Sequence, residues 1–128
     1  MARKTALLIS VAMVFALAAC GKKAEKVTFK AGSAIAANVE ILVSDGKVGK
    51  SAAVMEGYRP RVTFAGATED LSCVIHIANG GSIEPGQKGP ATIECEQDVS
   101  LDPAKAVFDL SEGGRKIGGG AVLISPTK

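Results

Sequence analysis

Residues 112–124 read Glu-Gly-Gly-Arg-Lys-Ile-Gly-Gly-Gly-Ala-Val-Leu-Ile, a glycine pair followed by a strand-like run that ends in aliphatic residues. Adjacent glycines permit a tight turn that side chains would block. An apolar, partly β-branched run after such a turn indicates a strand. The chain contains 15 glycines in all. This composition favours a tightly curved sheet with corners, such as a small barrel.

Short strand-like runs fill most of the chain after residue 26. Apolar residues alternate or come in short β-branched runs that Gly, Pro, Asn and Asp separate, and no convincing amphipathic helix is present. Val39, Ile41 and Val43 share one face of a predicted strand, and Ser-Asp-Gly-Lys at 44–47 predicts a hairpin turn after it. The predicted strands cover residues 27–29, 37–43, 52–55, 61–64, 71–77, 91–96, 106–110 and 116–124. Many short strands at regular spacing indicate an all-β barrel or sandwich.

The first 19 residues are typical of a leader. Arg3 and Lys4 form a positive start, residues 6–16 are apolar except for one serine, and Leu-Ala-Ala-Cys follows at 17–20. The apolar run is too short to span a bilayer core of ~30 Å as a helix. The pattern resembles a bacterial lipoprotein signal peptide, in which the cysteine takes a diacylglycerol thioether before the leader is cut. An ordinary secretory signal cut near Ala19 and an uncleaved anchor are the alternatives.

Cys20 is therefore the predicted lipidation site, and its acyl chains, palmitate among them, would hold the protein on a membrane. Each buried CH₂ contributes about 0.8 kcal/mol, so one chain alone is marginal whereas two or three anchor a protein stably. Gly21 follows the cysteine in place of Asp. By resemblance to lipoprotein sorting, this predicts a place in the cell envelope, on the outer membrane and facing the periplasm. Residues 21–26 form a polar tether, either solvated or touching anionic headgroups.

Charge and length exclude several classes of function. Of the 15 Lys and Arg residues, Arg3 and Lys4 lie in the leader, so the others balance the 13 Asp and Glu. A mature chain without net charge is not typical of nucleic-acid binding driven by bulk charge. One small domain fits this length, and the sequence lacks the Gly-x-x-x-x-Gly-Lys-Ser/Thr loop of nucleotide sites. We expect no cofactor, no nucleotide and no nucleic acid.

Few side chains point to catalysis. His76 is the only histidine, and no second histidine or carboxylate cluster accompanies it in the sequence to make a metal site. The alternation of its strand places it opposite the apolar face, so we expect it to face solvent or to be lightly packed. Glu94 and Glu96 share a strand face and are expected to be solvated. No Ser-His-Asp signature is visible, and the sequence predicts a protein that is not an enzyme.

Cys73 and Cys95 remain once Cys20 is used for the anchor. In an exported protein an even pair of cysteines suggests a disulfide. Both occupy apolar positions of alternating runs, so both should point into the core. The alternative is two free thiols in the core.

Two glycine–arginine motifs extend the fold prediction. Residues 57–64 read Gly-Tyr-Arg-Pro-Arg-Val-Thr-Phe, residues 85–87 read Pro-Gly-Gln, and residues 112–120 read Glu-Gly-Gly-Arg-Lys-Ile-Gly-Gly-Gly. In this order they resemble the C-terminal (third) domain of bacterial translation elongation factor Tu. There, a Gly-Tyr-Arg-Pro-Gln strand start, a Pro-Gly-Asp turn and a closing Glu-Gly-Gly-Arg-Thr-Val-Gly-Ala-Gly strand follow one another. The resemblance covers about residues 36–124 and implies a six-stranded antiparallel β-barrel.

The resemblance also implies a candidate binding surface, which the departures from the family restrict. The GTPase and second domains of the family are missing, and the loop at 45–50 lacks the arginine and histidine that help to grip tRNA. The cations that remain as candidates are Lys47, Lys50, Arg59, Arg61 and Arg115. Alternatively, the motif residues that this chain shares with that family only keep the fold, and the arginines at 59 and 115 pair with the nearby Glu56 and Glu112.

These observations predict four segments: a signal peptide over 1–19, the lipidated cysteine with a tether or arm over 20–35, the barrel over 36–125 and a tail over 126–128. We expect a membrane-anchored envelope lipoprotein whose barrel is a non-catalytic module that binds a protein of unknown identity. Since some proteins bind elongation factor Tu through its C-terminal barrel, an exported copy would serve as a decoy or immunity factor. The alternatives are a structural envelope protein and a small-barrel inhibitor of an envelope hydrolase.

Overall fold

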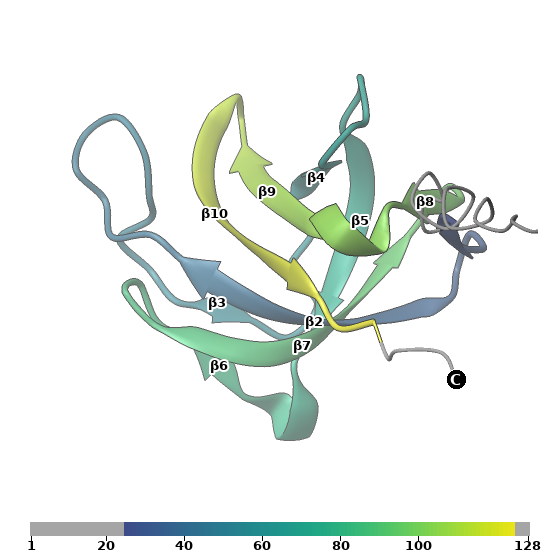
Figure 1. Ribbon diagram of the computed structural model, residues 1–128. Helices are drawn as coiled ribbons and strands as arrows, with labels where there is room; N and C mark the ends of the chain where they lie inside the picture. Colours follow the sequence, from purple (N-terminus) through teal and green to yellow (C-terminus); the bar gives the residue numbers. More distant parts are fainter. Residues whose placement is uncertain (1–24, 125–128) are drawn as a thin grey trace, which may run out of the picture.

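Six antiparallel strands close into a barrel at the centre of the molecule (Figure 1). The computed structural model describes residues 25–124. Around the barrel the strands follow the order β10-β2-β7-β5-β4-β9. Their bounds are Ala34–Ile41 (β2), Arg61–Phe64 (β4), Leu71–His76 (β5), Lys88–Cys95 (β7), Val107–Glu112 (β9) and Arg115–Val122 (β10). The predicted six-stranded antiparallel β-barrel is confirmed.

Short elements fill the connections between the barrel strands. They are Val27–Phe29 (β1), Val54–Met55 (β3), Ser82–Ile83 (β6), Val99–Leu101 (β8) and the 3-10 turns Ala78–Gly80 (η1) and Pro103–Lys105 (η2). β1 pairs with β8, and β3 pairs with β6. β6 and β8 were not predicted from the sequence.

The part of the chain that carries the predicted anchor is not described. The predicted leader, Cys20 and the tail at 126–128 lie outside the described residues. Within residues 25–124, no helix is long and apolar enough to cross a membrane.

Strand alternation divides the side chains between the core and the outer surface. Along β2, every second residue from Ile35 to Ile41 is buried and those between are exposed. The inward side chains of the other strands join them in one core of aliphatic residues, two phenylalanines and two cysteines. Among the described residues, no polar or charged side chain is buried. The apolar area removed from water thus stabilises the barrel, and the outward positions form its surface.

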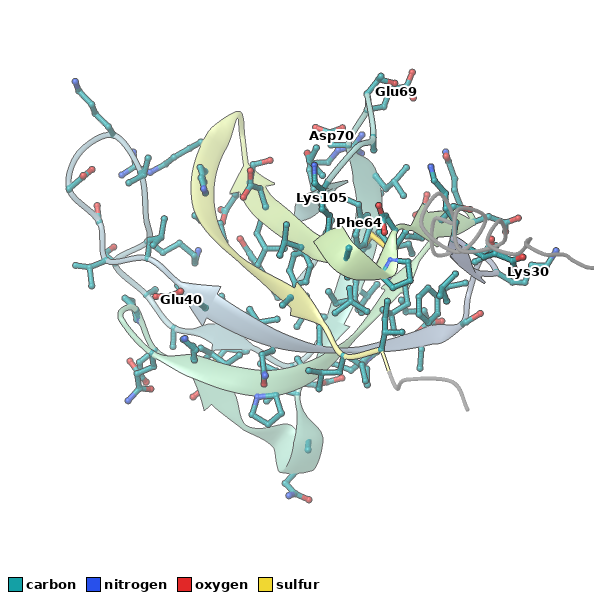
Figure 2. The ribbon with its side chains drawn as sticks, viewed as in Figure 1. Lys30, Glu40, Phe64, Glu69, Asp70 and Lys105 are labelled. Atoms are coloured by element: carbon teal, nitrogen blue, oxygen red, sulfur yellow. A yellow bond between two sulfur atoms is a disulfide. The ribbon has the colours of Figure 1, made fainter. Side chains whose placement is uncertain are left out.

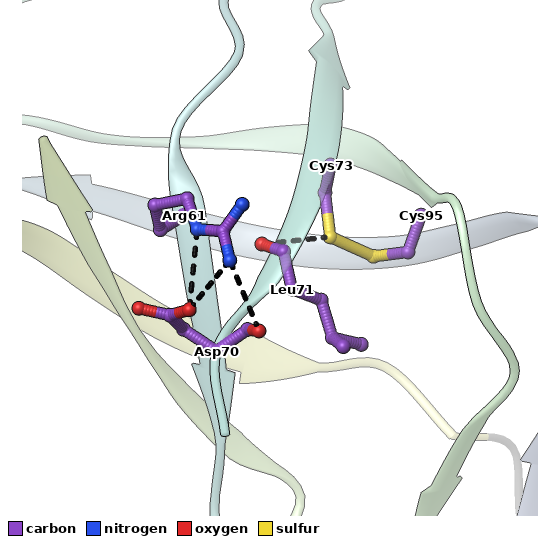
Figure 3. Close-up of a disulfide and its surroundings, with 5 residues drawn as sticks. All are labelled: Arg61, Asp70, Leu71, Cys73 and Cys95. Carbon is purple, nitrogen blue, oxygen red and sulfur yellow. Dashed lines mark hydrogen bonds and ion pairs between the residues drawn. A yellow bond between two sulfur atoms is a disulfide. The ribbon is translucent and has the colours of Figure 1, made fainter.

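Cys73 of β5 and Cys95 of β7 form a disulfide inside the barrel (Figure 3). The two residues lie directly opposite each other on neighbouring strands, with their Cα atoms 4.0 Å apart. Both are buried, at 1% and 4% exposure. The prediction of a bonded pair that faces the core is confirmed, and the alternative of two free thiols is wrong.

The glycines at 118–120 let β10 pack closely against both neighbouring strands. A Cβ atom at Gly118 would collide with the carbonyl oxygen of Glu40 on β2, and one at Gly119 with that of Phe108 on β9. The register of β10 against β9 also shifts between residues 116 and 118. Backbones this close leave no room for side chains, so β10 needs its glycines for packing.

The segment after β2 is a loop, and the predicted hairpin is wrong. Val43 is 61% exposed instead of sharing the buried face predicted for it. Asp45 Oδ1 accepts hydrogen bonds from the backbone N–H groups of Lys47 and Val48, which closes a local turn. Because β2 is already paired on both edges, with β10 and β7, it has no free edge for a strand that follows it.

Candidate functional site

A groove of about 570 Å³ lies on the outer surface of the barrel, over β2, β7 and the end of β5. Most of its lining is small or apolar, and two charged side chains stand at its rim. The lining residues are Ala36, Ala37, Glu56, His76, Ile77, Ala78, Gly80, Pro90, Ala91, Thr92 and Leu123. We take this groove as the candidate site.

Strand register explains why a depression forms there. Ala36 of β2 pairs with Thr92 of β7, and Thr92 pairs with His76 of β5, so three outward side chains form one row. The side chains of Ala36 and Thr92 are small, and residues of η1 line the groove beyond His76. On the opposite side, the backbone N–H of Leu123 donates to the Ala36 carbonyl (2.8 Å), and the Leu123 side chain is 52% exposed. The groove was not predicted from the sequence, although the uncharged outward positions Ala34, Ala36 and Asn38 were a signal for it.

His76 lies between two carboxylates at the rim of the groove. Its Nδ1 is 2.7 Å from Glu56 Oε2, and its Nε2 is 3.0 Å from Glu94 Oε1. Glu56 Oε1 also accepts a hydrogen bond of 2.5 Å from the backbone N–H of Ile77. The prediction that no carboxylate cluster accompanies His76 is correct for its neighbours in the sequence, but in the fold two carboxylates contact it. One of them is Glu94, which is therefore not merely solvated as expected. We call Glu56, His76 and Glu94 the carboxylate–imidazole clamp.

The geometry of the clamp favours the doubly protonated imidazolium. A neutral imidazole has one N–H and can donate to only one of the two carboxylates, whereas the imidazolium donates to both. Accordingly, the hydrogen bonds that His76 donates to Glu56 and, next in size, to Glu94 raise the pKa of His76. The hydrogen bonds from His76 and from the Ile77 backbone lower the pKa of Glu56.

We predict that the clamp stabilises the fold mainly between about pH 4.5 and 6.5, the ordinary pKa values of Glu and His. The pKa of His76 is raised on folding, so its contribution is complete below 6.5 and is lost as the pH rises through the folded value. The pKa of Glu56 is lowered, so its contribution is complete above 4.5 and is lost as the pH falls through the folded value.

Two measurements check this pH dependence. NMR titration of the His76 imidazole should give a midpoint above pH 6.5, because both carboxylates raise its pKa. His76 is the only histidine in the chain, so no other imidazole signal overlaps it. Denaturation of the wild type and of His76→Gln should differ most near pH 6 and converge in alkaline solution. A midpoint at or below 6.5 would refute the clamp as described.

Arg115 holds the loop after β2 in place. Its Nε donates to the Gly49 carbonyl (2.9 Å), and one terminal nitrogen donates to the Val48 carbonyl (3.1 Å) and to Ser44 Oγ (3.2 Å). These contacts join residues more than 60 positions apart in the chain. Arg115 therefore acts as a structural clasp between β10 and this loop.

Lys50 and Glu112 form a second polar group beside this loop. Lys50 Nζ lies 3.0 Å from Glu112 Oε1, and the hydroxyl of Tyr58 donates to the same oxygen. Burial and the hydrogen bond to Glu112 raise the pKa of Tyr58. The hydrogen bonds from Tyr58 and Lys50 lower the pKa of Glu112. The predicted pairing of the arginines at 59 and 115 with nearby glutamates is wrong, because Glu112 and Glu56 contact other side chains.

The five candidate cations do not gather into one surface. Lys50 and Arg115 line a hollow of about 240 Å³, and Lys47 is exposed in the adjoining loop. Arg61 on β4 pairs instead with Asp70 at 2.7 Å (Figure 3), with both side chains largely solvated. Arg59 is exposed beside a hollow that contains His76 and Glu94. The structure thus brings together Lys50 and Arg115, and places Arg59 next to the clamp.

The chain matches no protein-family model and no curated protein. Within the described part of the chain, no group of three or more His, Cys, Asp and Glu residues is arranged to hold a metal ion. The groove offers an apolar floor with an ionised rim, an arrangement that binds an apolar group and fixes its orientation by a charge.

Proposed function

We propose that this chain is a lipoprotein of the cell envelope, anchored by lipid on Cys20, and that its barrel is a non-catalytic module that binds another protein. The observation that carries the proposal is the open apolar groove over β2 and β7. Leu123 leaves 52% of its surface exposed at the groove edge. A concave, mostly apolar lining with a few polar groups at its rim is typical of binding sites.

Features of the sequence and of the core support export. The leader pattern ends in Leu-Ala-Ala-Cys at 17–20, and Gly21 favours the outer membrane, with the barrel facing the periplasm. The disulfide between Cys73 and Cys95 supports export, because disulfides are typical of oxidising compartments and cytosolic thiols are kept reduced. An anchor followed by a short tether would keep the barrel close to the membrane surface.

The motifs at 57–64 and 112–120 support a narrower version of the proposal. In it, the barrel is an exported relative of the third domain of elongation factor Tu and acts as a decoy or immunity factor toward a protein that binds that domain. The closed barrel of six antiparallel strands is compatible with such a relation. The loop at 45–50 is held by Arg115 within its own chain, which favours a protein partner over tRNA.

Cross-linking in intact cells tests the binding function. The full lipoprotein should form a discrete adduct with another protein after brief formaldehyde treatment. The matched control carries residues 1–33 of this chain fused to an unrelated periplasmic domain of similar size, so that anchor and tether are identical. Adducts that both proteins share would come from the anchor, and a complete absence of barrel-dependent adducts would contradict the proposal.

Lipidation is predicted at Cys20. Metabolic labelling with a palmitate analogue should mark the wild-type protein and leave Cys20→Ser unlabelled, because the thiol is the point of attachment. The substituted protein should also leave the membrane fraction or retain its leader. Cys73→Ala with Cys95→Ala is the control and should be labelled like the wild type. Equal labelling of Cys20→Ser and the wild type would rule out this anchor.

A further inference from the structure

The apolar surface of the barrel extends beyond the groove. Val107 of β9 pairs with Ala121 of β10, which pairs with Asn38 of β2, and Asn38 pairs with Pro90 of β7. These outward side chains form a second row beside the row that crosses the groove. Val107 is 50% exposed. We call the two rows, together with Leu123 at the edge of the groove, the apolar face. Apart from Asn38 and His76, its members are Ala36, Pro90, Thr92, Val107, Ala121 and Leu123.

The two charged borders of this face differ in net charge. On one border, Asp109 pairs with Lys116 at 3.2 Å, and Glu40 lies opposite Lys88 in the strand register, so the charges balance. On the other border stands the carboxylate–imidazole clamp, with two carboxylates and one imidazole.

The clamp therefore leaves one border negative. It has one uncompensated negative charge when His76 is protonated and two when it is neutral. The adjoining hollow adds Arg59 and Glu96, one positive and one negative side chain, which leave this net charge unchanged. A cation held beside the groove would be favoured at this border and at no matching place on the other.

The extent and charge of the face decide which kind of occupant it fits. A small ligand in the groove would leave Val107 and Ala121 uncovered, whereas a protein surface can cover both rows at once. The negative border repels anionic lipid headgroups, which rely on basic patches for attraction. A protein segment with an aliphatic side chain for the groove and a cation for the clamp satisfies both features.

We infer that the apolar face binds a partner protein through an aliphatic side chain that enters the groove and a neighbouring Lys or Arg that meets Glu56 and Glu94. This inference rests on the proposed function and adds to it the location and the chemistry of the contact. The aliphatic side chain contributes burial against Ala36, Pro90 and Leu123. The cation selects the orientation, because only one border of the face is negative.

Site-specific photo-cross-linking of the full lipoprotein in cells tests the location. A benzophenone amino acid at Ala36 or Thr92 should give the same adduct as one at Ala121 or Val107, since all four lie on the proposed contact. Glu69 is the control position: it is exposed in the β4–β5 loop, at the top of the view in Figure 2, whereas β7 crosses the lower half of the barrel in the same view in Figure 1. The same adduct from Glu69 would overturn the assignment to this face.

Charge reversal tests the chemistry. Glu94→Lys should reduce the adduct from Ala36 roughly tenfold, because a cation of the partner would meet a cation. Glu69→Lys makes the same charge change away from the face and should leave the adduct unchanged. The cross-linked peptide of the partner should carry Leu, Ile, Val or Met next to Lys or Arg. Changing that basic residue to Glu should restore the adduct with Glu94→Lys.

The outcomes separate this inference from the proposed function. Barrel-dependent formaldehyde adducts without any adduct from the four face positions would leave protein binding in place and overturn the apolar face. Adducts from the face that Glu94→Lys does not weaken would overturn the role of the cation. An adduct only from Ala36 and Thr92, to a small molecule, would overturn the protein partner. Absence of every adduct would reject the proposed function itself.

Discussion

Replacing Gly120 with alanine is expected to lower the free energy of unfolding by about 3 kcal/mol. The added Cβ would lie far inside van der Waals contact with the backbone oxygen of Asn38 and 2.9 Å from Cζ of Phe108. Neither neighbour can move at small cost, because Asn38 belongs to the paired strand β2 and the Phe108 ring packs on Phe64, with centroids 5.7 Å apart. The midpoint of urea denaturation measures the loss.

Gly113→Ala is the matched control, since the same methyl group enters open space in the turn before β10. Gly113 has φ of 60°, and a Cβ atom there would meet nothing within 4 Å. Only the left-handed backbone opposes the substitution, at about 1 kcal/mol. Equal losses for the two variants would show that close packing of β10 against β2 is not the reason for Gly120.

Reducing the Cys73–Cys95 disulfide is expected to lower the free energy of unfolding by about 3 kcal/mol. The bond closes a loop between residues 22 positions apart, which restricts the unfolded chain more than the folded one. Free thiols pack in a core as small apolar groups, so the folded barrel itself should persist. Denaturation with and without a phosphine reductant, after the protein has been reduced in the unfolded state, measures the difference.

The double variant Cys73→Ala with Cys95→Ala controls for effects of the reductant. Its midpoint should be low and should not change when the reductant is added. Alkylation of the exported wild-type protein without prior reduction should leave both thiols unmodified. If both thiols took up the reagent, or if reduction left the midpoint unchanged, the bridge would not form in the exported protein.

Much of the barrel could be predicted because strand alternation is a local property. The strand at 61–64 has the predicted bounds, and the one at 71–77 ends one residue early, at His76. The inward direction of Cys73 and Cys95 followed from the same alternation. The prediction of a strand over 37–43 is wrong at Val43, because β2 is already paired on both edges and Asp45 closes a local turn.

The candidate site could not be predicted in the same way. Glu56 and Glu94 lie 20 and 18 positions from His76, and nothing in their own neighbourhoods marks them as its partners. The groove likewise depends on Ala36, Thr92 and His76 falling into one row across three strands. Arg115, expected near Glu112, instead reaches carbonyl groups of a loop more than 60 positions away.

The sequence by itself determined the apolar face of the longer barrel strands and that the two later cysteines point inward, because a two-residue period acts within a few positions. Only the tertiary structure decided which strands became neighbours and in which register. Closure of the barrel placed β7 between β2 and β5, and so set Thr92 between Ala36 and His76. The groove and the clamp exist because side chains on different strands meet only after the barrel has closed.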